Sequence, residues 1–215
     1  MPNRSGQLYG LTLLSPILDD PRATPSHDLQ IRAYLATLPT DETSPFARAP
    51  GTHLARLVVM DDVIYVGAPS CEEHLKSKYL VFESNLDGDL DDYLTTLART
   101  VPADLDAIWS HCVGYPGATD PEAFVAYMKS CQLDTTFYFA AVNDRTLPQS
   151  LRALQTQHAV TRFLADHQGL SKRSTDPARL QADFLAFAAK LAAEPLPRPG
   201  SSAPYRPIKT GGHNE

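Results

Sequence analysis

The stretch GTHLARLVVM, residues 51–60, decides the fold. Alternation along a strand places mostly apolar side chains on both of its faces, which predicts a central strand covered on both sides. The same alternation places His53 and Arg56 on opposite faces. A polar side chain in a covered strand needs a partner or a ligand. We therefore identify both as candidate catalytic residues, His53 to move a proton and Arg56 to anchor an anionic group.

A structural interpretation of these two residues stands beside the functional one. In it, Arg56 forms an ion pair with an acid such as Glu83 on the neighbouring strand, and His53 bonds a backbone carbonyl. Because structural ion pairs also occur in covered sheets, the sequence leaves both interpretations open.

The rest of the chain supplies further strands and helices around this stretch. Apolar, β-prone runs predict strands at residues 79–85 and 135–142 and a short strand at 63–66. Capping residues and apolar periodicity predict helices after Ser26 through Leu38, from Leu90 to about Thr100, at 102–109, from Pro121 through Met128, from about Pro148 to His167 and from Pro177 to about Ala193. This order predicts an α+β fold, a ferredoxin-like antiparallel sheet with helices on one face and extra C-terminal helices.

Three regions follow from this pattern. Residues 1–50, punctuated by prolines, are expected to form an N-terminal arm with one short helix. Residues 51–194 form the α+β domain. Residues 195–215 are rich in Pro, Gly and Ser and lack an apolar period, which predicts a disordered tail or one draped over the surface.

Composition limits the classes of function. The 215 residues are 43% hydrophobic and carry a net charge of -6, as expected of a globular protein that does not bind nucleic acid. No run approaches the ~20 apolar residues that span a bilayer, so no membrane partner is expected. Three cysteines without a CxxC spacing indicate reduced thiols, and we expect a cytoplasmic protein.

Four further polar or aromatic residues are candidate ligand-binding residues: Asn85, Trp109, His111 and His158. Trp109 is placed to form a pocket wall. His111 could contribute with Cys112 to a metal site, or Cys112 beside it could be an activated thiol, although a loop packed over the sheet edge explains these residues as well. His158 lies on the apolar stripe of a predicted helix, either as an axial haem ligand or as a core residue. The acidic stretch 85–92 lacks the spacing of an EF-hand, so we interpret it as a capped strand-to-helix turn and predict no metal site.

Two motifs carry a resemblance to a known family. The run of residues 44–59 contains THxAR and residues 80–88 contain LxFxSNxDG. They resemble a poorly characterised bacterial family found with haem peroxidases, catalases and lipid-oxidising enzymes, and the fold is similar to the dimeric α+β barrel group. The resemblance implies a homodimer and leaves haem open as a cofactor. Of the peroxidases' GxxDG motif, this chain shares only Asp87 and Gly88.

The sequence therefore favours a small-molecule enzyme acting on an apolar, acidic or oxygenated substrate by oxidation, isomerisation or cyclisation. Asn85 and Trp109 would shape its pocket. The alternatives are a haem- or lipid-binding accessory protein of an oxidative pathway and a non-catalytic interaction module whose sheet face pairs with a partner or with itself.

Overall fold

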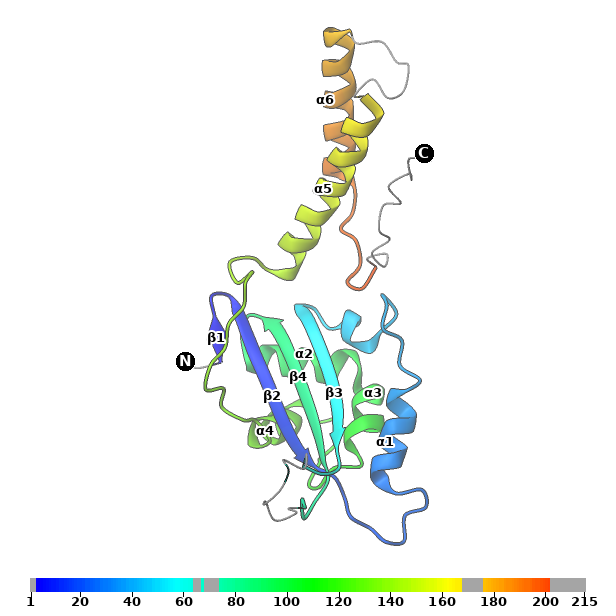
Figure 1. Ribbon diagram of the computed structural model, residues 1–215, viewed down its shortest axis with the longest axis vertical. Helices are drawn as coiled ribbons and strands as arrows, with labels where there is room; N and C mark the ends of the chain where they lie inside the picture. The colour runs from blue at the N-terminus through cyan, green and yellow to red at the C-terminus, as the bar shows by residue number, and fades with distance from the viewer. Residues whose placement is uncertain (1–2, 64–66, 68–73, 168–175, 202–215) are drawn as a thin grey trace.

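The computed structural model describes residues 3–63, 67, 74–167 and 176–201, and these form an α+β fold (Figure 1). Its four strands form one antiparallel sheet in the order β1-β2-β4-β3. The strands are β1 (Arg4–Ser5), β2 (Leu8–Pro16), β3 (Thr52–Met60) and β4 (Tyr79–Asp87). The helices are α1 (His27–Leu35), the 3-10 turn η1 (Pro45–Arg48), α2 (Leu90–Thr100), α3 (Pro102–Trp109), α4 (Pro121–Ser130), α5 (Leu147–His167) and α6 (Pro177–Ala193). The predicted fold class is confirmed.

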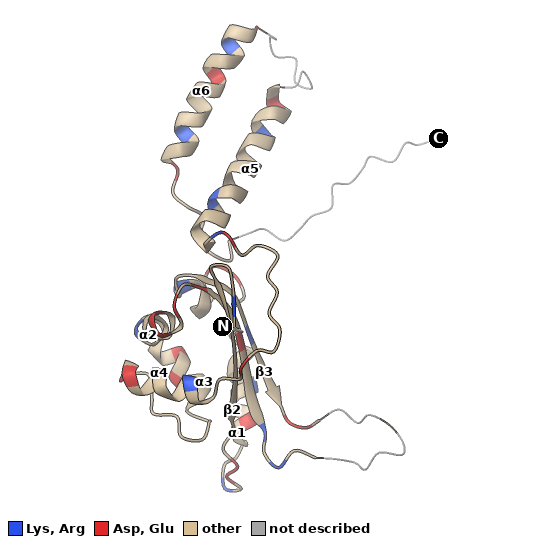
Figure 2. Ribbon diagram, turned by 90° about the vertical axis from the view of Figure 1, so that its left-hand side faces the viewer, with Lys and Arg blue, Asp and Glu red and all other residues tan. Residues whose placement is uncertain are grey.

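The succession β2–α1–β3–β4–α2, with β4 between β2 and β3, matches the first three strands of a ferredoxin-like sheet. Helices α2, α3 and α4 lie together on one face of the sheet (Figure 2). Alternate residues of β2 and β4 point into the core between sheet and helices, among them Leu11, Leu13, Leu80, Phe82 and Leu86.

The N-terminal region differs from the expected arm. Leu8–Pro16 is an interior strand that pairs with β4 along its whole length, from Leu8 opposite Asp87 to Pro16 opposite Tyr79. Alternation buries Leu11 and Leu13, while Pro16 is tolerated because it is the last residue of the strand. The apolar run that contains Pro16 was therefore misinterpreted as part of an arm.

Strand β3 lies at the edge of the sheet, so the expectation of a central strand was wrong. Its Val59 faces the core, but Leu54 and Val58 on the other face are each 46% exposed. Apolar side chains on both faces of a strand allow both faces to be buried but do not require it. Here no helix covers the second face (Figure 2). We call this uncovered side the open face.

The expected strand at residues 135–142 is not formed. The chain pairs briefly with β2, where the Leu14 N–H donates to the Cys131 carbonyl at 2.8 Å and the Leu133 N–H to the Thr12 carbonyl at 2.9 Å. Beyond this point β1 pairs with the start of β2 and fills that edge. Residues 134–146 therefore continue on the open face as an irregular linker (Figure 2). Of the expected strand at 63–66, residues 64–66 lie outside the described residues.

Helices α5 and α6 form a hairpin that stands away from the sheet (Figure 1). The chain after α6 first runs back along α5, where the Arg152 guanidinium donates to the Glu194 carbonyl and the Gln155 amide to that of Pro195, both at 3.0 Å. It then reaches the α+β domain, where Gly200 lies against the backbone of Asp41. Residues 195–201 of the expected tail are thus draped over the surface, and 202–215 lie outside the described residues. None of the described helices is long and apolar enough to cross a membrane.

Candidate functional site

The start of β3 is fixed by several contacts. Gly51 adopts φ +82°, a conformation that favours glycine, and its carbonyl accepts from the Asp87 N–H at 3.0 Å. The buried hydroxyl of Thr52 donates to the Ala49 carbonyl at 3.0 Å and lies 3.1 Å from the Tyr93 hydroxyl. Burial raises the pKa of Tyr93, which keeps its hydroxyl protonated. The backbone before His53 is therefore held by both the sheet and helix α2.

A β-bulge at His53 changes the expected alternation. The register shifts between Thr52, which lies opposite Leu86, and Leu54, which lies opposite Asn85. A bulge adds one unpaired residue and redirects its side chain. The prediction that strand alternation separates His53 from Arg56 was wrong for this reason: His53 contacts Asp87 and Arg56 contacts Glu83, and residues 83 and 87 lie on the same face of β4. Both residues also line one cavity beside β3.

His53 is paired with a carboxylate. Its Nε2 lies 2.8 Å from Oδ1 of Asp87, and Oδ2 of the same carboxylate accepts from the backbone N–H of Leu147 at 2.8 Å. The side chains of His53 and Asp87 are 19% and 14% exposed. When the imidazole is neutral, the carboxylate fixes the proton on Nε2, because an ionised carboxylate only accepts. Nδ1 is then left as a proton acceptor.

The cavity beside His53 has a volume of about 450 Å³. Its floor is β3, and its walls come from the end of α1, from η1 and from the returning chain after α6. Six of its lining residues are Leu38, Phe46, His53, Arg56, Pro199 and Gly200. It combines apolar walls with a histidine and an arginine, as small-molecule sites do.

Arg56 forms an ion pair with Glu83 on β4, as the structural interpretation of the sequence predicted. The Arg56 side chain is 65% exposed, so the pair lies in water and contributes little to stability. Its guanidinium remains accessible from the cavity. The structural role does not exclude an anion-binding role.

Asn85 and Trp109 lie away from this cavity. Oδ1 of Asn85 accepts from the Tyr138 hydroxyl at 3.3 Å, under the linker on the open face. Trp109 is completely buried, with its Nε1 donating to Ser15 Oγ at 3.3 Å and its ring edge-on to Phe82 at 5.5 Å. A tryptophan with a satisfied N–H and full burial is a core residue, so the structure places it in the core instead of in a pocket wall.

His111 lies against a histidine that the sequence analysis did not single out. Its Nδ1 is 2.9 Å from Nδ1 of His27, the first residue of α1. Burial lowers the pKa of His111, and the nearby His27 lowers it further. Neither of these histidines is among the residues that line the cavity beside His53.

His158 is exposed on α5, and the apolar cavity between α5 and α6 is lined by His167 instead. The position therefore does not fit a haem ligand enclosed by a cavity. His158 is not a core residue either, because its side chain is exposed and helix α6 packs against a different side of α5.

The remaining motifs have structural explanations. Burial raises the pKa of Cys112 to about 12, with Cys131 as a lesser cause, so Cys112 is not an activated thiol. Oδ1 of Asp89 accepts from the N–H groups of Asp91 and Asp92, as expected for a helix cap. Within the part of the chain that the structure describes, no three His, Cys, Asp or Glu residues form a metal-binding group.

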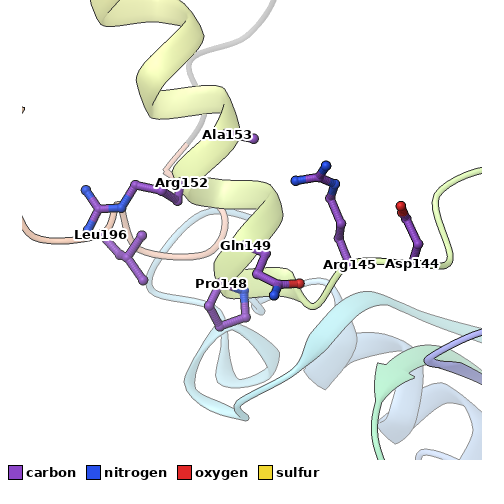
Figure 3. A pocket seen from close by; sticks show the side chains of 7 residues that line it. All are labelled: Asp144, Arg145, Pro148, Gln149, Arg152, Ala153 and Leu196. Atoms are coloured by element: carbon purple, nitrogen blue, oxygen red, sulfur yellow. The ribbon is translucent and has the colours of Figure 1, made fainter. Parts of the chain in front are cut away.

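A second hollow, of about 520 Å³, lies at the base of the hairpin (Figure 3). It is lined by Arg145, Gln149, Arg152 and Leu196, among others. Figure 3 shows the Arg152 guanidinium turned toward Leu196 and that of Arg145 on the other side of the helix. Because the two cations do not converge, this hollow is a weaker candidate site than the cavity beside His53.

Asp87 was not predicted as the partner of His53. A signal was present: extending the Arg56–Glu83 pairing along an antiparallel ladder brings residue 53 opposite residue 86, next to Asp87. Comparisons of the chain with protein-family models, with curated proteins and with solved structures find no match in any of the three. The fold and site thus describe an α+β domain with a histidine–aspartate pair beside an open cavity.

Proposed function

We propose that this chain is a small-molecule enzyme in which His53 moves a proton on an apolar substrate with an anionic or oxygenated group. The observation that carries the proposal is the hydrogen bond between His53 and Asp87 at the wall of the cavity. A histidine oriented by a buried carboxylate is a common form of general base.

The proposed step is proton transfer without an oxidant. Nδ1 of His53 takes a proton from a carbon next to a carbonyl, and the electron pair of the broken C–H bond moves into the carbonyl to form an enolate. The imidazolium, stabilised by Asp87, returns the proton to the same or a neighbouring carbon. The products are the starting acid or its isomer, so atoms and electrons balance.

Arg56 has the supporting role of binding the anionic end of the substrate. Guanidinium groups bind carboxylates with two parallel hydrogen bonds. Arg56 already pairs with Glu83, and its high exposure leaves donors available on the cavity side. Substrate binding through Arg56 predicts an effect on KM when Arg56 is changed.

Deuterium exchange tests the proposal. The protein is incubated in D₂O with a panel of medium-chain 2-oxo acids and 3-enoic acids, and isotope incorporation is followed by mass spectrometry. We expect catalysed exchange with at least one acid, its loss in His53→Gln, and full exchange in the control His158→Gln, which changes an exposed histidine on α5. The absence of catalysed exchange across the panel, or its persistence in His53→Gln, would refute the proposal.

A further inference from the structure

Among the helices and strands that the structure describes, α5 and α6 are the least completely packed. Neither helix has a single buried residue. The two helices meet through Phe163, whose ring lies 4.8 Å from that of Phe187 and 5.6 Å from that of Phe184. The His167 imidazole also lies 3.8 Å from the Asp183 carboxylate. Most helices in proteins are stabilised by burying an apolar face, and these few contacts leave most of the surface of both helices in water.

One side of this hairpin has an apolar hollow. The hollow has a volume of about 430 Å³ and is lined mainly by Phe163, Leu164, Leu180 and Phe184. The last three of these side chains are 48%, 41% and 46% exposed. Clustered exposed apolar side chains of this kind mark interaction surfaces.

Nothing in the described part of the chain covers this side, because the hairpin stands clear of the sheet and of helices α1–α4 (Figures 1 and 2). The residues given after 201 add few large apolar side chains. Residues 202–215 contain only Tyr205 and Ile208 as large apolar residues. Two such side chains supply much less apolar surface than a pair of helices would.

We propose that the hairpin is a dimer interface, in which α5 and α6 pack against the same helices of a second copy to form a four-helix bundle. Such bundles bury the shared faces of two hairpins around one core. The same surface on both copies gives a closed, two-fold symmetric dimer. The leucine and phenylalanine side chains around each hollow would then be buried at the interface.

The size of the hairpin suits this occupant. Its helices have 21 and 17 residues, and about half of them would face the partner. This gives roughly 20 residues a side, the lower limit of stable interfaces, which bury about 800 Å² per partner. The buried area is therefore large enough for a stable dimer only if both helices of each hairpin contact the partner.

Charge is compatible with self-association. The ends of the helices near the hollow carry Arg162 and Asp166 on α5, and Arg179 and Asp183 on α6. Figure 2 shows both signs on both helices. Near the hollow a second copy thus brings equal numbers of positive and negative groups, so that no net repulsion opposes the pairing there. Farther along the hairpin, Arg152 and Lys190 add two cations.

The oligomeric state of the full chain tests the proposal. Light scattering after gel filtration should give twice the 23.5 kDa mass of the chain. Leu164→Glu should give the monomer with an unchanged circular dichroism spectrum in the sheet region. The matched control is Leu54→Glu on the open face, because Leu54 is 46% exposed and Leu164 is 48% exposed. This control should remain dimeric.

Three outcomes overturn the proposal. The first is a monomeric wild-type protein at all concentrations. The second is a dimer that Leu54→Glu dissociates and Leu164→Glu does not, which would place the interface on the open face. The third is a monomer that binds vesicles of phosphatidylcholine and phosphatidylglycerol through Leu164, which would make the hairpin a membrane-binding element.

A second measurement covers the case in which Leu164→Glu unfolds the hairpin. Small-angle X-ray scattering of the unmodified chain distinguishes the two dimers by shape. An antiparallel bundle at the centre places the two α+β domains at opposite ends of a long particle. Packing through the open faces gives two adjacent domains with protruding hairpins, and a scattering curve of that form would contradict the proposal.

Discussion

The carboxylate of Asp87 fixes His53 from the neighbouring strand, with 2.8 Å between Oδ1 and Nε2. Its other oxygen accepts from the Leu147 N–H at the beginning of α5. One side chain therefore orients the proposed base and attaches the helical hairpin to the sheet. The candidate site and the proposed dimer interface are connected through this residue.

We expect Asp87→Asn to weaken both connections. Hydrogen bonds to charged groups contribute about 1.5–3 kcal/mol, so the free energy of unfolding should fall by about this amount. The hairpin should also be cleaved faster by limited proteolysis than in the wild type. His53→Gln removes only one of the two hydrogen bonds and should have the smaller effect on hairpin cleavage. Equal cleavage rates for wild type and Asp87→Asn would contradict this role.

Gly10 allows the linker to lie on the open face. A Cβ at Gly10 would lie 2.9 Å from the ring of Tyr138, closer than side-chain contacts permit. Gly10→Ala should therefore displace Tyr138 and destabilise the protein by about 1–3 kcal/mol, the usual cost of overpacking.

The double variant Gly10→Ala/Tyr138→Ala separates this clash from the intrinsic effect of alanine in β2. Removing the ring removes the clash, so the double variant should lose less stability than the sum of the two single changes. Urea unfolding of the four proteins measures this coupling. Strict additivity would show that Tyr138 does not lie on Gly10 in solution.

Local signals were sufficient to predict much of the fold. The Asp89 and Asp120 caps, followed by apolar periodicity, predicted α2 and α4, and both side chains accept the expected N–H groups. Strands β3 and β4 were predicted from their β-branched and aromatic residues. These helices and strands could be predicted because the residues that indicate them lie within or next to each segment.

Features that depend on distant segments were not predicted. Residues 135–142 have strand propensity, but β1 occupies the position beside β2 that this segment would need. The bulge at His53 depends on the register with β4, and the partnership of His27 with His111 joins segments far apart in the chain. Propensity alone does not determine which segments compete for one edge.

Cys112 should be unreactive in the folded protein. Its side chain is buried, and a thiol with a pKa of about 12 has almost no thiolate at pH 8. Brief treatment with iodoacetamide at that pH should label Cys131, which is partly exposed, before Cys112. Both should react in denaturant. Labelling of Cys112 as fast as Cys131 in the native protein would contradict its burial.

The contact between His27 and His111 should make stability depend on pH. The pKa of His111 is lowered in the folded state by burial and by His27, so below its ordinary value of about 6.5 the unfolded chain binds more protons. Stability should therefore be complete above that pH and decrease as pH falls toward the lowered pKa. Asp20 lies close enough to His27 to interact electrostatically with it.

Urea unfolding between pH 5 and pH 8 measures this dependence. His111→Gln should flatten the decrease below neutral pH, because glutamine does not titrate. His158→Gln is the control, since it removes an exposed histidine on α5 that has no part in this contact. An unchanged pH profile in His111→Gln, or an equal flattening in His158→Gln, would show that the acid sensitivity arises elsewhere in the chain.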